Sequence, residues 1–153
     1  MAKAYTSTIN LSKLAKTYGV LPAKVNKDIG LRYRKYRSEK MAQGLALDTL
    51  QPHTKLKPAT VKAKIRHGSP TPTIPLMDTA NMSRGTNIVA KDGLLEITQG
   101  VTRQQIQAFH QKGAGHNPVR VSLAWNSEFL EGEAYPIIRN HYSKMIANAR
   151  RTG

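Results

Sequence analysis

A long amphipathic segment in the first third of the chain is the feature that most constrains the fold. Its apolar residues recur at spacings of four, four, three and five positions, at Val25, Ile29, Tyr33, Tyr36 and Met41. An α-helix has about 3.6 residues per turn, so this spacing places them on one helical face. We therefore predict a helix from Ala23 to about Gln43, ended by Gly44. Gly30 inside this helix is less favourable than alanine by about 1 kcal/mol.

Similar patterns predict further helices. The closing segment has apolar residues at spacings of three, four, three and four: Tyr135, Ile138, Tyr142, Met145 and Ala149. Shorter helices are expected over Leu11–Tyr18, Pro58–Arg66 and Arg103–Lys112. Helical segments are thus expected on both sides of the middle of the chain.

A hairpin signal lies between the helical segments. An Asp-Gly pair at positions 92–93 separates two alternating runs, Thr86–Lys91 and Leu94–Thr98, which is typical of a two-residue hairpin turn. The alternation over residues 119–124 predicts a third, half-buried strand. The predicted fold class is α+β: a small antiparallel sheet, made of the hairpin and a third strand, packed against a long N-terminal helix and a C-terminal helix. Residues 1–153 are expected to form a single domain.

Residues 45–76 are expected to form an extended, basic and proline-bearing excursion within that domain. Three prolines fall in the six residues 70–75, and proline disfavours both a helix and a central strand. No acidic residue occurs between Asp48 and Asp78. We predict that this segment makes few contacts in the free subunit and that it becomes ordered, or rearranges, on a partner.

Basic residues are concentrated in the first half of the chain. Fifteen of the twenty-four Lys and Arg residues precede Met77, against three acids, so the first half carries about +12 and the second about +3. Such an excess of positive charge requires an acidic partner. The candidates are nucleic acid, anionic lipid and an acidic protein surface. Charge alone does not choose among these partners. The basic residues expected to face the partner or DNA are Lys24, Lys27, Arg32, Arg34, Lys35, Arg37, Lys55, Lys57, Lys62, Lys64 and Arg66.

Tyr33 and Tyr36 lie among these basic residues, and two interpretations are open. They could stack on bases while the neighbouring cations hold phosphates. They could instead pack in the core, because both fall on the apolar stripe, and this is the favoured explanation. An amphipathic membrane helix is a weaker option, since the stripe lacks Trp, Phe and Leu.

The sequence contains none of the local signatures of a catalytic or metal site. There is no cysteine, which excludes disulfides and thiolate ligands. The five histidines form neither an HxxxH nor an HExxH motif, and the GxSxG and Walker patterns are absent. No signal-peptide block and no run of about 18 apolar residues occurs. We therefore expect a soluble intracellular protein without enzymatic activity, metal or cofactor.

Three acids precede the closing helix: Glu128, Glu131 and Glu133. Acidic residues are favourable there because the N-terminal end of a helix dipole is positive. A second hypothesis is that these acids form a ring interface with the basic first half of a neighbouring copy, because a ring requires two different complementary patches on each subunit.

Three segments occur in an order that resembles one protein family. The first, Leu56–Gly68, holds a leucine, a proline and a threonine followed by lysines. The second, Pro75–Met82, holds an aspartate–threonine pair, and the third, Phe109–Arg120, holds a histidine–glutamine–x–glycine turn and a later proline–x–arginine. Together they resemble the virion-morphogenesis, or tail-completion, proteins of tailed bacteriophages. The matching positions are Pro58, Thr60, Asp78, Thr79, His110, Gln111, Gly113, Pro118 and Arg120.

Several of these positions can be given structural roles on physical grounds. The Asp78-Thr79 pair can close a turn through side-chain hydrogen bonds. The His110-Gln111 pair can satisfy backbone groups where a helix ends at Gly113. Arg120 suits a pairing across a subunit interface.

The resemblance implies a non-enzymatic structural protein of the virion. Such a protein acts at the head–tail interface, where it forms a neck ring, expected to be a hexamer, and joins the tail to the connector. Its partners would be its own copies and the adjoining neck and tail proteins, with no membrane. Its basic residues could contact acidic surfaces of those proteins, or they could line the route of the genomic DNA in the channel. It would reside in the host cytoplasm before assembly and in the virion afterwards. The excursion 45–76 is then expected to dock on a different ring protein. The alternative function is that of a basic nucleic-acid-binding module.

Overall fold

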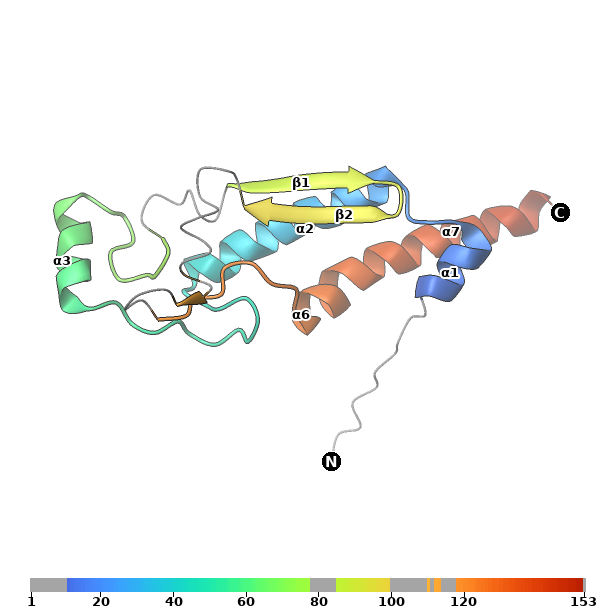
Figure 1. The fold of residues 1–153 in the computed structure, drawn as a ribbon. Helices are drawn as coiled ribbons and strands as arrows, with labels where there is room; N and C mark the ends of the chain where they lie inside the picture. The colour runs from blue at the N-terminus through green and yellow to red at the C-terminus, as the bar shows by residue number, and fades with distance from the viewer. Residues whose placement is uncertain (1–10, 78–84, 100–109, 111, 114–117, 153) are drawn as a thin grey trace, which may run out of the picture.

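The chain forms an elongated molecule in which a long helix and a two-stranded sheet pack against each other (Figure 1). The computed structural model describes residues 11–77, 85–99, 110, 112–113 and 118–152. The elements in chain order are α1 (Leu11–Tyr18), α2 (Ala23–Ala42), α3 (Pro58–Arg66), β1 (Thr86–Lys91), β2 (Leu94–Gln99), α6 (Ser127–Phe129), the π-helical turn η1 (Leu130–Ala134) and α7 (Tyr135–Thr152). The fold therefore mixes helices with a two-stranded antiparallel sheet.

The predicted helices are close to the observed ones. α1 and α3 have the predicted bounds, and α2 begins at Ala23 as predicted and ends at Ala42. The long helix is the second of the chain, because α1 precedes it. The helix predicted over Arg103–Lys112 lies almost wholly outside the described residues.

The sheet packs directly on α2, and Gly30 makes this possible. The strands pair in the register that joins Thr86 to Gln99 and Lys91 to Leu94. A Cβ atom placed on Gly30 would lie 2.6 Å from Ile88 Cγ2 and 3.2 Å from Leu95 Cδ1. The absence of a side chain at residue 30 therefore lets the two strands lie against the helix, although glycine lowers helix propensity.

The hairpin turn is also tied to the start of α2. Asp92 Oδ1 accepts a hydrogen bond from the backbone N–H of Ala23 at 2.7 Å, whereas Pro22, at the N-cap position, offers no side-chain acceptor. The N–H of Gly93 donates to the carbonyl of Leu21 at 2.8 Å, and Asn26 Nδ2 donates to the carbonyl of Lys91 at 2.8 Å. The residues that make the turn thus also cap the helix and fix its direction.

The main core lies between α2, the sheet and the start of α7. Tyr33 and Tyr36 are 1% and 8% exposed, so the prediction that both pack in the core is confirmed. The Tyr33 ring contacts the Phe129 ring edge-on, with centroids 5.1 Å apart. The buried residues of this core are Ile29, Tyr33, Tyr36, Leu47, Phe129, Ala134, Ile138 and Tyr142.

The predicted third strand over residues 119–124 is wrong. Within the described residues the sheet has two strands, β1 and β2. Side chains of α2 form hydrogen bonds with the backbone groups that a third strand would use for pairing. Arg37 Nε donates to the carbonyl of Ser122 at 2.6 Å. The Tyr33 hydroxyl donates to the carbonyl of Ala124 at 2.8 Å and accepts from its N–H at 3.1 Å. The alternating side chains therefore mark an extended segment that packs on a helix.

Residues 45–76 divide into two parts, so the prediction of one extended excursion is corrected. Residues 45–54 belong to the body: Leu47 is 0% exposed, and its N–H donates to the carbonyl of Val121 at 3.0 Å. The remaining part carries α3 at one end of the molecule (Figure 1). No residue of α3 is buried.

Candidate functional site

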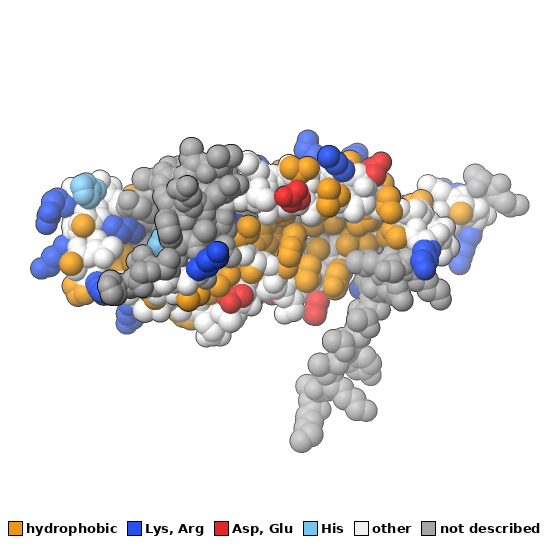
Figure 2. Space-filling view, viewed as in Figure 1, with side chains coloured by type: hydrophobic (Ala, Val, Ile, Leu, Met, Phe, Trp, Pro, Cys, Tyr) orange, Lys and Arg blue, Asp and Glu red, His pale blue; other side chains and the backbone are white. Residues whose placement is uncertain are grey.

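We call residues 55–77 the basic lobe. Among its exposed side chains are the cations Lys55, Lys57, Lys62 and Arg66, together with Ile65, which is 59% exposed. Figure 2 shows Lys and Arg side chains gathered over α3 at this end of the molecule. The lobe contains no acidic residue, so every charge on its surface is positive.

The lobe is folded back on itself by Lys64. Its ammonium donates to three carbonyl oxygens, those of Thr71 at 2.9 Å, Ile74 at 2.8 Å and Met77 at 3.0 Å. The Thr71 hydroxyl donates to the carbonyl of Met77 as well. Ile74 and Met77 pack with Met41, near the C-terminal end of α2. The proline-bearing segment is therefore a set of turns closed on α3, and the prediction of an extended connection is wrong.

Lys64 and Arg37 were both predicted to face a partner, and both predictions are corrected. Lys64 is half-buried and directs its charge into the lobe. Arg37 is 0% exposed, and its guanidinium donates to Ser122 O, Thr86 Oγ1 at 2.9 Å and Gln99 Oε1 at 2.7 Å. Burial lowers the pKa of Arg37 to about 10. Arg37 lies four residues after Tyr33, so its place on the buried stripe was readable from spacing.

The other predicted cations lie on or near the surface. Arg34 is half-buried, and its Nη2 donates to the carbonyl of Thr86 at 2.8 Å. Lys24, Lys27, Arg32 and Lys35 are exposed along α2. Their role as partner-facing residues stays a prediction.

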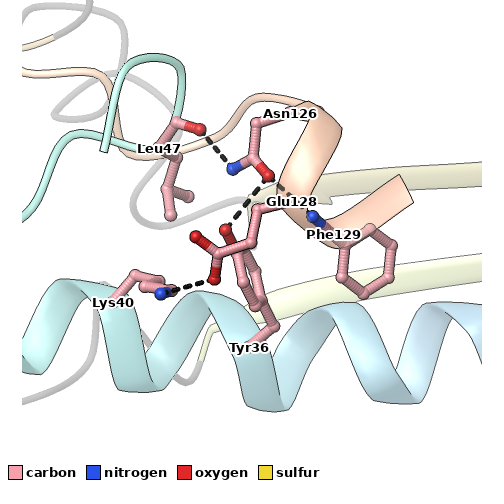
Figure 3. Close-up of polar contacts among 6 residues, drawn as sticks. All are labelled: Tyr36, Lys40, Leu47, Asn126, Glu128 and Phe129. Atoms are coloured by element: carbon pink, nitrogen blue, oxygen red, sulfur yellow. Dashed lines mark hydrogen bonds and ion pairs between the residues drawn. The ribbon is translucent and has the colours of Figure 1, made fainter. Parts of the chain in front are cut away.

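Two of the three acids predicted at a ring interface form ion pairs within the chain. Glu128 Oε1 lies 2.6 Å from Lys40 Nζ, and the hydrogen bond to Glu128 raises the pKa of Lys40 (Figure 3). Glu133 Oε2 lies 3.5 Å from Arg32 Nη1. Glu131 is exposed. The intramolecular pairs account for two of these acids without a neighbour, while their role at an interface stays a prediction.

Asn126 connects α2, α6 and the segment at Leu47 through hydrogen bonds. Its role was not predicted from the sequence. Its Oδ1 accepts from the Tyr36 hydroxyl at 3.0 Å and from the N–H of Phe129 at 2.9 Å (Figure 3). Its Nδ2 donates to the carbonyl of Leu47 at 2.6 Å. The available signal was its position: an asparagine three residues before Phe129 is a favoured helix N-cap.

A second polar cluster joins His53, His110 and Arg120. The backbone N–H of Arg120 donates to the carbonyl of His110 at 2.8 Å, and its guanidinium reaches the carbonyl of Thr54 at 3.4 Å. Burial lowers the pKa of both histidines, and the charge of Arg120 lowers each pKa further. Arg120 is 6% exposed, so the prediction that it pairs across a subunit interface is corrected.

The remaining family positions have mixed outcomes. Pro58 occupies the first turn of α3, and Thr60 is exposed on that helix. Gly113 has a φ of +63°, which suits the predicted helix end. Pro118 is half-buried, whereas Asp78, Thr79 and Gln111 lie outside the described residues.

An open groove of about 550 Å³ runs between α2 and α7. Its α2 wall presents Leu31, which is 45% exposed, and its α7 wall presents Ile137. The lining residues, which define the α2–α7 groove, are Asp28, Leu31, Arg32, Lys35, Ile137 and Asn140. The lining thus combines two apolar side chains with one acid and two cations at the surface.

Two absences hold for the described part of the chain. It contains no group of three or more His, Cys, Asp or Glu side chains placed to hold a metal ion. None of its helices is long and apolar enough to span a membrane.

Comparison with known proteins finds no matching family model, no similar curated protein and no similar solved structure.

Proposed function

We propose that this chain is a structural, non-enzymatic protein of a tailed-phage virion, which acts in a ring at the head–tail interface and completes the tail. The basic lobe is the observation that carries this proposal. It is a preorganised surface at one end of the molecule, held by Lys64, with its remaining cations exposed and no helical residue buried. Such a surface suits a contact with another subunit. The three sequence segments that resemble tail-completion proteins supply the choice of assembly.

A basic nucleic-acid-binding module is the second candidate. The uniform positive charge of the lobe favours it, because lysine and arginine neutralise phosphates and release counterions. A free DNA binder would retard duplex DNA at moderate salt, and its affinity would fall steeply as salt rises. A neck component is expected to show little retention of free duplex DNA under the same conditions.

A phage that lacks the gene provides the test. We expect it to accumulate filled heads and separate tails, and complementation with the wild-type chain should restore joined, infectious particles that contain the protein. Normal joined particles without the protein would refute the proposal. A variant with Lys64 replaced by methionine should complement poorly, because the lobe loses the cation that closes it.

A further inference from the structure

We propose that the basic lobe of one copy docks in the α2–α7 groove of the next copy, so that head-to-tail contacts build the ring. This inference rests on the proposed ring function and names the two surfaces that form it. It also replaces the sequence-based expectation that the lobe docks on a different protein, because the chain itself carries a surface to match.

The lobe presents one helical face to the partner. Lys62, Ile65 and Arg66 are related by three and four positions along α3, so they lie on the same side of the helix. All three are exposed, and Ile65 is 59% exposed. An aliphatic side chain between two cations suits a protein surface. A phosphate backbone offers Ile65 no apolar contact, so the face suits DNA less well.

The groove presents two apolar side chains and one acid, Asp28, beside two cations that already have acidic partners in the same chain. Asp28, Leu31 and Arg32 also lie at spacings of three and four, on one face of α2. Leu31 and Ile137 supply an apolar surface for Ile65. Arg32 already pairs with Glu133, and Lys35 pairs with Glu39 at 3.9 Å. Asp28 makes no ion pair with another described residue, so it is the acid open to Lys62 or Arg66 of a neighbour.

The contact must be intermolecular. The lobe attaches at the C-terminal end of α2, and Asp28 lies 14 positions before Ala42, the last residue of that helix. At a rise of about 1.5 Å per residue this separation is roughly 21 Å. Two different patches on one subunit make a heterologous contact, and such contacts close into a ring when the rotation between copies allows it.

Two single variants test the contact through their mixture. Ile65→Asp places a charge in the contact surface of the lobe and leaves the groove unchanged. Leu31→Asp places a charge in the groove and leaves the lobe unchanged. In native mass spectrometry of the full chain, we expect the wild type to form a ring and each variant to be monomeric. An equimolar mixture should give a 1:1 heterodimer and nothing larger, because only one working interface can form.

Controls and contrary outcomes separate this inference from the proposed function. Val89→Asp changes a side chain that is 41% exposed on the outer side of β1, and it should leave the ring unchanged. The charge reversal Asp28→Lys should weaken the ring, and Lys62→Glu in the same chain should restore part of it. Rings that persist in both aspartate variants would overturn the docking inference while leaving the ring function standing. A monomeric wild type, or a mixture that stays monomeric, would overturn the inference as well. Loss of DNA retention in Ile65→Asp with an intact ring would show that the lobe faces nucleic acid instead.

Discussion

Replacing Gly30 by alanine tests the packing of the sheet on α2. In an isolated helix this change is favourable by about 1 kcal/mol, because glycine has the larger backbone entropy to lose. Here the new methyl group would lie 2.6 Å from Ile88 Cγ2 and 3.2 Å from Leu95 Cδ1. Ile88 is β-branched and has few side-chain rotamers with which to retreat. The strands must therefore shift away from the helix.

The net effect follows from two opposing terms. Overpacking a close contact costs about 1–3 kcal/mol. After the propensity gain is subtracted, Gly30→Ala should destabilise the protein by roughly 1 kcal/mol. Urea unfolding followed by circular dichroism should show a lower midpoint with an unchanged slope.

Two companion variants make the test specific. In an Ile88→Ala background the closest contact is gone, so Gly30→Ala should become neutral or stabilising, with a coupling free energy of at least about 1 kcal/mol. A Cβ on Gly132 has no heavy atom within 4 Å, and Gly132→Ala should not destabilise. If Gly30→Ala stabilises the wild-type background by the full propensity gain, the close helix–sheet approach described above is wrong.

Three further changes probe other contacts. Arg37→Lys should destabilise the fold by about 3 kcal/mol in urea unfolding, because an ammonium cannot replace the guanidinium at its three buried acceptors; a loss below about 1 kcal/mol would contradict this role. Asp92→Ala should cost about 1 kcal/mol through the lost hydrogen bond to Ala23, and Asp92→Asn should recover most of it. The pKa values of His53 and His110 are lowered in the fold, so the unfolded chain binds protons more readily and stability should fall as the pH drops below about 6.5. Replacing both histidines by glutamine should flatten that part of the stability profile, and an equally steep decline in the variant would assign it to other groups.

The helices and the hairpin could be predicted because their signals are local. The spacing of Val25, Ile29 and Tyr33 fixes a helical face, and the Asp-Gly pair at 92–93 fixes a turn without reference to distant residues. The predicted core position of the α2 tyrosines was correct for the same reason.

The errors came from residues whose role depends on distant partners. The spacing of Arg37 from Tyr33 indicates a buried position, but its acceptors come from β1, β2 and the segment at Ser122, which spacing does not reveal. The alternation over residues 119–124 did not reveal that side chains of α2 form hydrogen bonds with the backbone of this segment. Lys64 likewise donates to carbonyls 7, 10 and 13 positions later, across a series of turns whose path no local pattern in the sequence indicates.

The same distinction applies to the candidate site. The exposed cations of the lobe and their lack of acids were visible in the composition of residues 45–76. The sequence did not reveal that Lys64 closes this segment or that Leu31 and Ile137 face each other across a groove. Both depend on contacts between elements that are far apart in the chain.

The mass of the purified full chain under native conditions tests the central claim most directly. If the subunit is a ring-forming virion protein, native mass spectrometry should give one closed oligomer, expected to be six copies, that persists as the chain is diluted through the micromolar range. A single species at 16.9 kDa at every concentration would contradict the account.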